Sequence, residues 1–220
     1  MLRPTTDREL NGLYARLPKS VAYVDETSDL GKKPLYAMSA VIVDGASLDG
    51  TRDDFLDLVG NDYWHTSSAL ASSDPALIAR VEKFVQYLAD SDVVTLCTID
   101  TDPTHFENVE KVRAYTLNSL ARVLRIRYGV ELMVIERRRA GAEEEADNRT
   151  LHNLQSIHEL RDLRVHQGTP SSEPLLWAPD VVAATLRRRI ARDQPAWYEP
   201  IREKTTLLRA GSFEPIVLQK

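Results

Sequence analysis

Continuous apolar runs alternate with stretches of helical period along most of the chain. Four runs are short and rich in β-branched residues, as is typical of strands covered on both faces. They lie at 21–24, 35–43, 93–99 and 130–135. Strands come first and then alternate with helices, an order that favours a mixed α/β sheet with helices on its faces.

Helical spacing is clearest in three places. Asp74-Pro75 supplies an N-cap and a first-turn proline for one helix, and a second is expected over about 106–128, ended by Gly129. A third begins at Asp180. Shorter helices are expected near 8–17 and 151–160.

Two segments carry no regular period. Residues 46–73 show no legible pattern of either kind. Residues 140–150 include Glu143-Glu144-Glu145, a charge run typical of a solvated loop. We therefore expect no helix or strand between 140 and 150.

Length and composition suit one domain. Of the 220 residues, 43% are hydrophobic, which is enough to bury a core. We expect a polar lead-in at 1–19, one domain at 20–194, and a C-terminal tail at 195–220 that packs on it. No apolar run reaches signal-peptide or bilayer-spanning length, and the single Cys97 excludes an internal disulfide. A soluble, cytoplasmic protein without membrane contact is therefore expected.

Charge is distributed unevenly. The net charge is −5, but residues 1–110 hold 9 basic and 19 acidic side chains, whereas 111–220 hold 19 basic and 14 acidic. An acidic half beside an arginine-rich half fits a metal pocket flanked by a phosphate-binding surface. Ordinary variation of surface charge fits the same counts.

Carboxylates follow three of the predicted strands and begin one helix. Asp25 (with Glu26), Asp100 and Glu136 come directly after apolar runs, and Asp180 opens the last long helix. Ligands of open α/β sheets lie outside the carboxyl ends of the strands. Acids that converge there repel one another unless a cation joins them, and Mg²⁺ or Mn²⁺ accepts such oxygen ligands.

Each acid also fits a purely structural role. Asp25, Glu26 and Asp100 suit turns, and Asp180 suits the first turn of a helix, where the dipole favours a negative charge. Glu136 can pair with the arginines that follow it. The set, rather than any one member, favours a metal site.

The order of these motifs resembles a prokaryotic and phage family called domain of unknown function 3800. The matching segments are Val24-Asp25-Glu26-Thr27-Ser28-Asp29 before the strand at 36–43, Tyr63-Trp64-His65-Thr66, Asp100 with Tyr115, Met133-Val134-Ile135-Glu136-Arg137, and Leu175 to Ala183. The resemblance covers about 21–190. It implies a ribonuclease-H-like fold whose acids bind the metal of a nuclease.

This chain departs from the family pattern at several positions. Thr27 and Ser28 stand where the family has Ser and Gly, and Glu136 stands where it has Asp. Trp177-Ala178-Pro179 replaces Gln-Leu-Ala before Asp180, which removes an amide and inserts a rigid residue. Both an active and a degenerate site are compatible with these changes.

The leading hypothesis is a nuclease that uses Mg²⁺ or Mn²⁺ on RNA or DNA. The resemblance implies that Asp25 bridges the metals, that Glu136 and Asp180 complete the ligands, and that Glu26 ranks second. Asp100 and His65 are weaker candidates, with His65 considered for proton transfer. Six arginines are candidates to hold phosphates; they are Arg137, Arg138, Arg139, Arg187, Arg188 and Arg192.

Two other functions stay open. One is a catalytically degenerate protein of the same fold that binds a partner, in phage–host conflict or a toxin-like system. The other is a metal-dependent phosphatase or nucleotide hydrolase. A protein partner or a homodimer is compatible with either. The sequence holds no Gly-rich phosphate loop and no Cys/His spacing of a structural zinc site.

Overall fold

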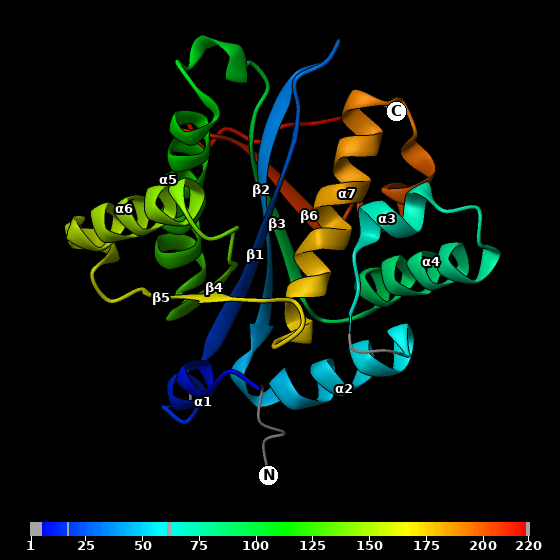
Figure 1. Ribbon diagram of the computed structural model, residues 1–220, viewed down its shortest axis with the longest axis horizontal. Helices are drawn as coiled ribbons and strands as arrows, with labels where there is room; N and C mark the ends of the chain where they lie inside the picture. Colours follow the sequence, from blue (N-terminus) through cyan, green and yellow to red (C-terminus); the bar gives the residue numbers. More distant parts are fainter. Residues whose placement is uncertain (1–5, 17, 61–62, 219–220) are drawn as a thin grey trace.

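The computed structural model describes residues 6–16, 18–60 and 63–218. Over these ranges the chain forms a six-stranded sheet with helices packed on both faces (Figure 1). The strands are β1 (Ser20–Asp29), β2 (Leu35–Asp44), β3 (Val94–Asp100), β4 (Leu132–Glu136), β5 (Arg164–Gly168) and β6 (Thr205–Arg209). The α-helices are α1 (Arg8–Tyr14), α2 (Leu48–Val59), α3 (Thr66–Ala71), α4 (Pro75–Asp90), α5 (Val109–Tyr128), α6 (Ala142–Ser156) and α7 (Trp177–Ala191).

The strands lie in the order β5-β4-β1-β2-β3-β6. β2 runs antiparallel to both of its neighbours, whereas β1–β4, β4–β5 and β3–β6 are parallel pairs. All strands except β2 therefore point the same way. Their carboxyl ends share one edge of the sheet, and β1 and β4 are adjacent there.

Two layers of helices cover the sheet. α7 lies across β1 and β2 and shares one apolar core with α1 to α4, while α5 and α6 pack on the opposite face (Figure 1). Side chains of β1 alternate between these cores, with Val21 and Tyr23 in the first and Ala22 and Val24 in the second. This two-residue period decides which face of the sheet each polar side chain of a strand reaches.

The structure confirms the four predicted strands as β1 to β4. β1 is longer than expected, since it continues from Val24 to Asp29, so Asp25 lies within the strand rather than after it. The Asp74 side chain caps α4 by accepting a hydrogen bond from the Ala76 N–H at 2.9 Å. Gly129 ends α5 with a φ of 64°, in the left-handed region that favours glycine.

Two predictions about helices are wrong. Residues 142–150, expected to be a loop, belong to α6, and Glu143-Glu144-Glu145 occupies its first turn. Acids are stabilised there by the helix dipole, so the charge run marks a helix start rather than a loop. α7 begins at Trp177 rather than Asp180, because Pro179 lies in the first turn, where no N–H partner is needed.

The segment from residue 195 contributes more to the sheet than the sequence indicated. It was expected to pack on the domain as a tail, and it supplies β6, which pairs with β3. β5, α2 and α3 were likewise not predicted.

No helix within the described ranges has the length and apolar character needed to cross a lipid bilayer.

A buried polar network fixes the start of α7. Arg52 of α2 donates from Nε to Glu173 Oε1 and from Nη2 to Glu173 Oε2, both at 3.0 Å. Tyr14 donates to the same carboxylate at 2.9 Å and lies 2.7 Å from the Tyr23 hydroxyl. Glu173 also accepts the Leu175 N–H at 3.1 Å, just before α7. The Arg52 and Glu173 side chains are only 4% and 0% exposed.

Removing one member of this pair leaves an uncompensated buried charge. We expect Arg52→Met to lower the free energy of unfolding at neutral pH by about 3–5 kcal/mol. Urea denaturation followed by circular dichroism measures the loss. Replacing both residues, as Arg52→Met with Glu173→Leu, should recover part of it.

Asp49→Asn is the matched control for this prediction. Asp49 is the other, more exposed partner of Arg52, at 2.9 Å and 31% exposed, so its loss should cost at most about 1 kcal/mol. Equal losses for Asp49→Asn and Arg52→Met would contradict the role assigned to Glu173.

Candidate active site

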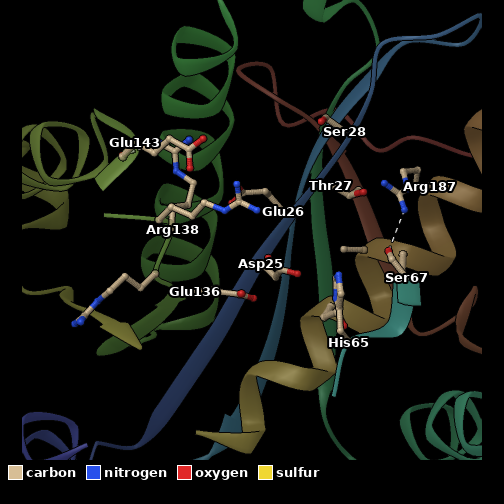
Figure 2. Close-up of a pocket in the computed structure, with 15 residues that line it drawn as sticks. Asp25, Glu26, Thr27, Ser28, His65, Ser67, Glu136, Arg138, Glu143 and Arg187 are labelled. Carbon is tan, nitrogen blue, oxygen red and sulfur yellow. Dashed lines mark hydrogen bonds and ion pairs between the residues drawn. The ribbon is translucent and has the colours of Figure 1, made fainter. Parts of the chain in front are cut away.

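A cavity of about 490 Å³ opens at the carboxyl edge of β1 and β4, against α7 (Figure 2). Its lining is strongly polar and comes from β1, the end of β4 with the segment that follows it, α6, α3 and α7. The lining residues are Asp25, Glu26, Thr27, Ser28, His65, Ser67, Glu136, Arg137, Arg138, Arg139, Glu143, Asp180, Ala183, Ala184 and Arg187.

Strand register brings Asp25 and Glu136 together. The last parallel pair of β1 and β4 is Val24 with Ile135, so Asp25 and Glu136 each follow it by one residue. Val24 and Ile135 both face the α5 core, so the next side chains both face α7. Adjacent strands lie about 4.8 Å apart, which places two carboxylates side by side. Figure 2 shows both side chains in the cavity.

Asp180 reaches the same cavity from the first turn of α7. One carboxylate oxygen accepts the Thr66 N–H at 2.7 Å, and the other lies 3.5 Å from His65 Nδ1. Trp64 is buried and donates its indole N–H to the Thr66 hydroxyl at 2.9 Å, which fixes this segment. The Tyr63 to Thr66 motif is thus folded around Asp180.

The negative charges of the three acids are only partly compensated by the cationic side chains around them. Burial raises the pKa of Asp25 well above its ordinary value, and the charges of Asp180 and Glu136 raise it further. Burial and the charge of Asp180 raise the pKa of Glu136 in the same direction. Arg113 opposes both shifts, and His65 opposes that of Glu136. A bound cation would remove the repulsion.

Glu26 points to the opposite face of the sheet. It forms an ion pair with Arg113 of α5, a side chain only 1% exposed. Arg113 in turn donates to Asp147 of α6 at 2.7 and 3.0 Å. Glu26, predicted as a second-rank ligand, lines the cavity with the three acids, but its carboxylate is held by Arg113 in this network.

Only some of the predicted arginines line the cavity. Arg137, Arg138, Arg139 and Arg187 do. The charge of Arg138 is already matched by Glu110 at 2.6 Å and Asp147 at 2.8 Å.

Arg188 and Arg192 lie outside the cavity lining. Arg188 donates to the Leu70 carbonyl and to Gln194. Arg192 is exposed at the end of α7. The helical period explains the difference, since Arg187 is seven residues from Asp180, on the same face of α7.

Asp100 is also outside the cavity. It pairs in register with Tyr36, whose side chain lies in the α5 core, so Asp100 faces away from Asp25. Its carboxylate accepts the Asp102 N–H at 2.8 Å, as in the turn considered from the sequence. Tyr115 donates to the Ala210 carbonyl and does not line the cavity either.

Three residues of the site were not found from the sequence. Ser67 lies in the segment without a legible period, and Glu143 was assigned to a loop. Arg113 adjoins an apolar helical stripe and carries no motif. Of the three, only Ser67 could have been suggested by the sequence, because it lies two residues after the candidate His65.

The donor set fits a hard divalent cation. The acids provide carboxylate oxygens, which suit Mg²⁺ or Mn²⁺, and no thiol lines the cavity. Among the described residues, no three His, Cys, Asp or Glu side chains already stand close enough together to hold a metal ion. Binding would therefore require small rotamer changes that bring the carboxylates together.

The fold is shared with ribonucleases of the H2 and H3 type. Ribonuclease HII of Archaeoglobus fulgidus, solved in complex with PCNA, matches with a TM-score of 0.51 and 13% identity over 79% of this chain and 75% of that chain. Ribonuclease H2 of Pyrococcus horikoshii matches with a TM-score of 0.50 and 12% identity over 81% and 77%. A variant of Bst-RNase HIII matches with a TM-score of 0.50 and 14% identity over 82% and 56%.

These similarities establish a ribonuclease-H-like α/β fold. At such low identity they show the fold alone. No family model and no curated protein matches the chain. Membership of the domain of unknown function 3800 family therefore stays a prediction.

The contact between His65 and Asp180 predicts a measurable titration. The hydrogen bond and charge of Asp180 raise the pKa of His65 above 6.5, against partial burial and the charge of Arg187, which lower it. The protonated form is thus favoured in the folded state. Its stabilising contribution is complete below the unfolded pKa of about 6.5 and is lost as pH rises through the folded value.

NMR titration of the metal-free protein in EDTA measures this pKa. We expect Asp180→Asn to bring it back toward 6.5, while the signals of His152, exposed on α6, should not respond. An unchanged His65 titration in Asp180→Asn would refute the pairing.

Proposed function

We propose that the chain is a divalent-metal-dependent nuclease that hydrolyses phosphodiester bonds of RNA or DNA. The observation that carries the proposal is the placing of Asp25, Glu136 and Asp180, from β1, β4 and α7, around one cavity. Their mutual repulsion favours a bound cation. The ribonuclease-H-like fold supports the same class of reaction by analogy.

Asp25, Glu136 and Asp180 would hold Mg²⁺ or Mn²⁺. When bound, such an ion activates water and stabilises the charge that develops on the phosphate oxygens. Asp25 lies on β1, which pairs with the β4 strand of Glu136 and packs against the α7 helix of Asp180, and this suits it to the central ligand position.

His65 is proposed to hold a proton for the leaving oxygen. Asp180 lies 3.5 Å from its Nδ1 and raises the pKa of the ring, which favours the protonated form. Its side chain is 49% exposed, so the ring is accessible from the cavity. A histidine whose pKa is raised holds its proton more readily, which suits a general acid.

A catalytically degenerate binding protein is the second candidate. The specific observation in its favour is that both carboxylate oxygens of Asp180 are already engaged, by Thr66 and His65. A protein of this kind would bind no metal at the acids. Isothermal titration with Mn²⁺ separates the two, since the nuclease requires metal binding that Asp25→Asn weakens.

The nuclease predicts metal-dependent cleavage by the purified full chain. With Mn²⁺ or Mg²⁺ it should cleave labelled RNA or DNA, and EDTA should abolish the activity. Asp25→Asn should lower the rate at least roughly 100-fold, because it removes a ligand charge from the centre of the cluster. Gel analysis of end-labelled oligonucleotides gives the rates.

Asp90→Asn is the matched control, because Asp90 is an exposed acid at the end of α4, away from the cavity, and accepts a hydrogen bond from Gln86 at 2.9 Å. It should cleave at the wild-type rate. Cleavage by Asp25→Asn at that same rate, or no cleavage of either polymer by the wild type, would exclude the nuclease.

A further inference from the structure

Arg187 is a cavity arginine with a buried N–H group that lacks an acceptor among the described residues. It lies on the face of α7 that also presents Asp180, Ala183 and Ala184 to the cavity. Its Nη2 donates to the Ser67 hydroxyl of α3 at 3.0 Å. Its Nε–H is buried and has no hydrogen-bond partner within the part of the chain that the structure describes.

The charge of Arg187 is likewise unmatched. Among the described residues no carboxylate forms an ion pair with it, whereas Arg138 pairs with Glu110 and Asp147, and Arg113 with Asp147 and Glu26. A buried donor without an acceptor is costly. A guanidinium with a free N–H therefore favours an anionic acceptor in the cavity.

Ser67 makes this position suited to a tetrahedral anion. Its oxygen accepts from Arg187, which leaves its own O–H proton available to a second acceptor oxygen. A guanidinium and a hydroxyl side by side match the several acceptor oxygens of a phosphate. Figure 2 shows the Arg187–Ser67 pair on the opposite side of Asp25 from Arg138.

We infer that Arg187 and Ser67 form a phosphate subsite for the phosphate next to the one that is hydrolysed. The inference rests on the proposed function. Asp180 and Arg187 lie seven residues apart on α7, about 10 Å along the helix axis. This separation of their backbones leaves room for a second phosphate at Arg187 beside the one at the acids. The substrate is thus a polynucleotide strand rather than a mononucleotide.

Binding without cleavage tests this subsite. The full-length Asp25→Asn protein is titrated against fluorescein-labelled single-stranded DNA and RNA oligonucleotides, each with one neutral methylphosphonate linkage, and anisotropy is recorded. Neutralising one particular linkage should weaken binding roughly 10- to 100-fold. In the double variant Asp25→Asn with Arg187→Gln, the affinity for the unmodified strand should fall by a similar factor. Neutralising that linkage should then cause no further loss of affinity.

Further variants separate charge from geometry. Arg187→Gln should reduce the slope of log affinity against log salt by about 1. Arg187→Lys should keep that slope but lose part of the affinity, because the planar fork is gone. Ser67→Ala should weaken binding at the same linkage. Circular dichroism of each variant checks folding.

Arg127→Gln is the control. It removes the same charge from an exposed arginine in the last turn of α5, which is outside the cavity lining. Binding should stay unchanged at every linkage.

Several outcomes overturn the inference. Wild-type affinity in Arg187→Gln, or no linkage dependence in the protein that retains Arg187, removes the subsite even if the protein cleaves. A mononucleotide that binds as tightly as the strand, with the same dependence on Arg187, removes the claim for a strand. Linkage-specific binding without any cleavage by the wild-type chain retains the subsite and removes the nuclease.

Discussion

Crowding of negative charge at one edge of the sheet is the constraint on which the site depends. Parallel pairing of β1 with β4 sets Asp25 beside Glu136, and α7 adds Asp180 from above. Burial and, after it, the charges of the neighbouring acids raise the pKa values of Asp25 and Glu136. Arg113 and His65 offset part of the repulsion between the acids, and the remainder is what a divalent cation would neutralise.

The scaffold resists this repulsion through two buried ionic networks on opposite faces. The pair of Arg52 and Glu173 fixes the start of α7, and therefore the position of Asp180 relative to the sheet. Arg113 and Asp147 join α5 to α6 on the other face and also hold Glu26. Buried ion pairs add little net stability, but breaking one is costly, so these networks fix positions more than they strengthen the fold.

The cavity combines acids with arginines, of which Arg187 forms no ion pair among the described residues. Asp25 lies between Arg187 and Ser67 on one side and Arg138 on the other (Figure 2). Such an arrangement suits a chain of phosphates that passes over a cation bound at the acids, as we propose. The engaged state of Asp180 is the feature that any catalytic cycle must accommodate, because its oxygens also satisfy Thr66 and His65.

The sequence by itself determined β1 to β4, the capped ends of α4 and α5, and the candidate acids, because these depend on local period and turn chemistry. It could not decide which acids meet. Strand parity turns Asp100 away from Asp25, and the same alternation turns Glu26 toward the buried Arg113. Arg187 lines the cavity and Arg188 does not, because consecutive residues of a helix point in different directions. These outcomes depend on which residues pair across strands and helices, and such contacts are made only when the chain folds.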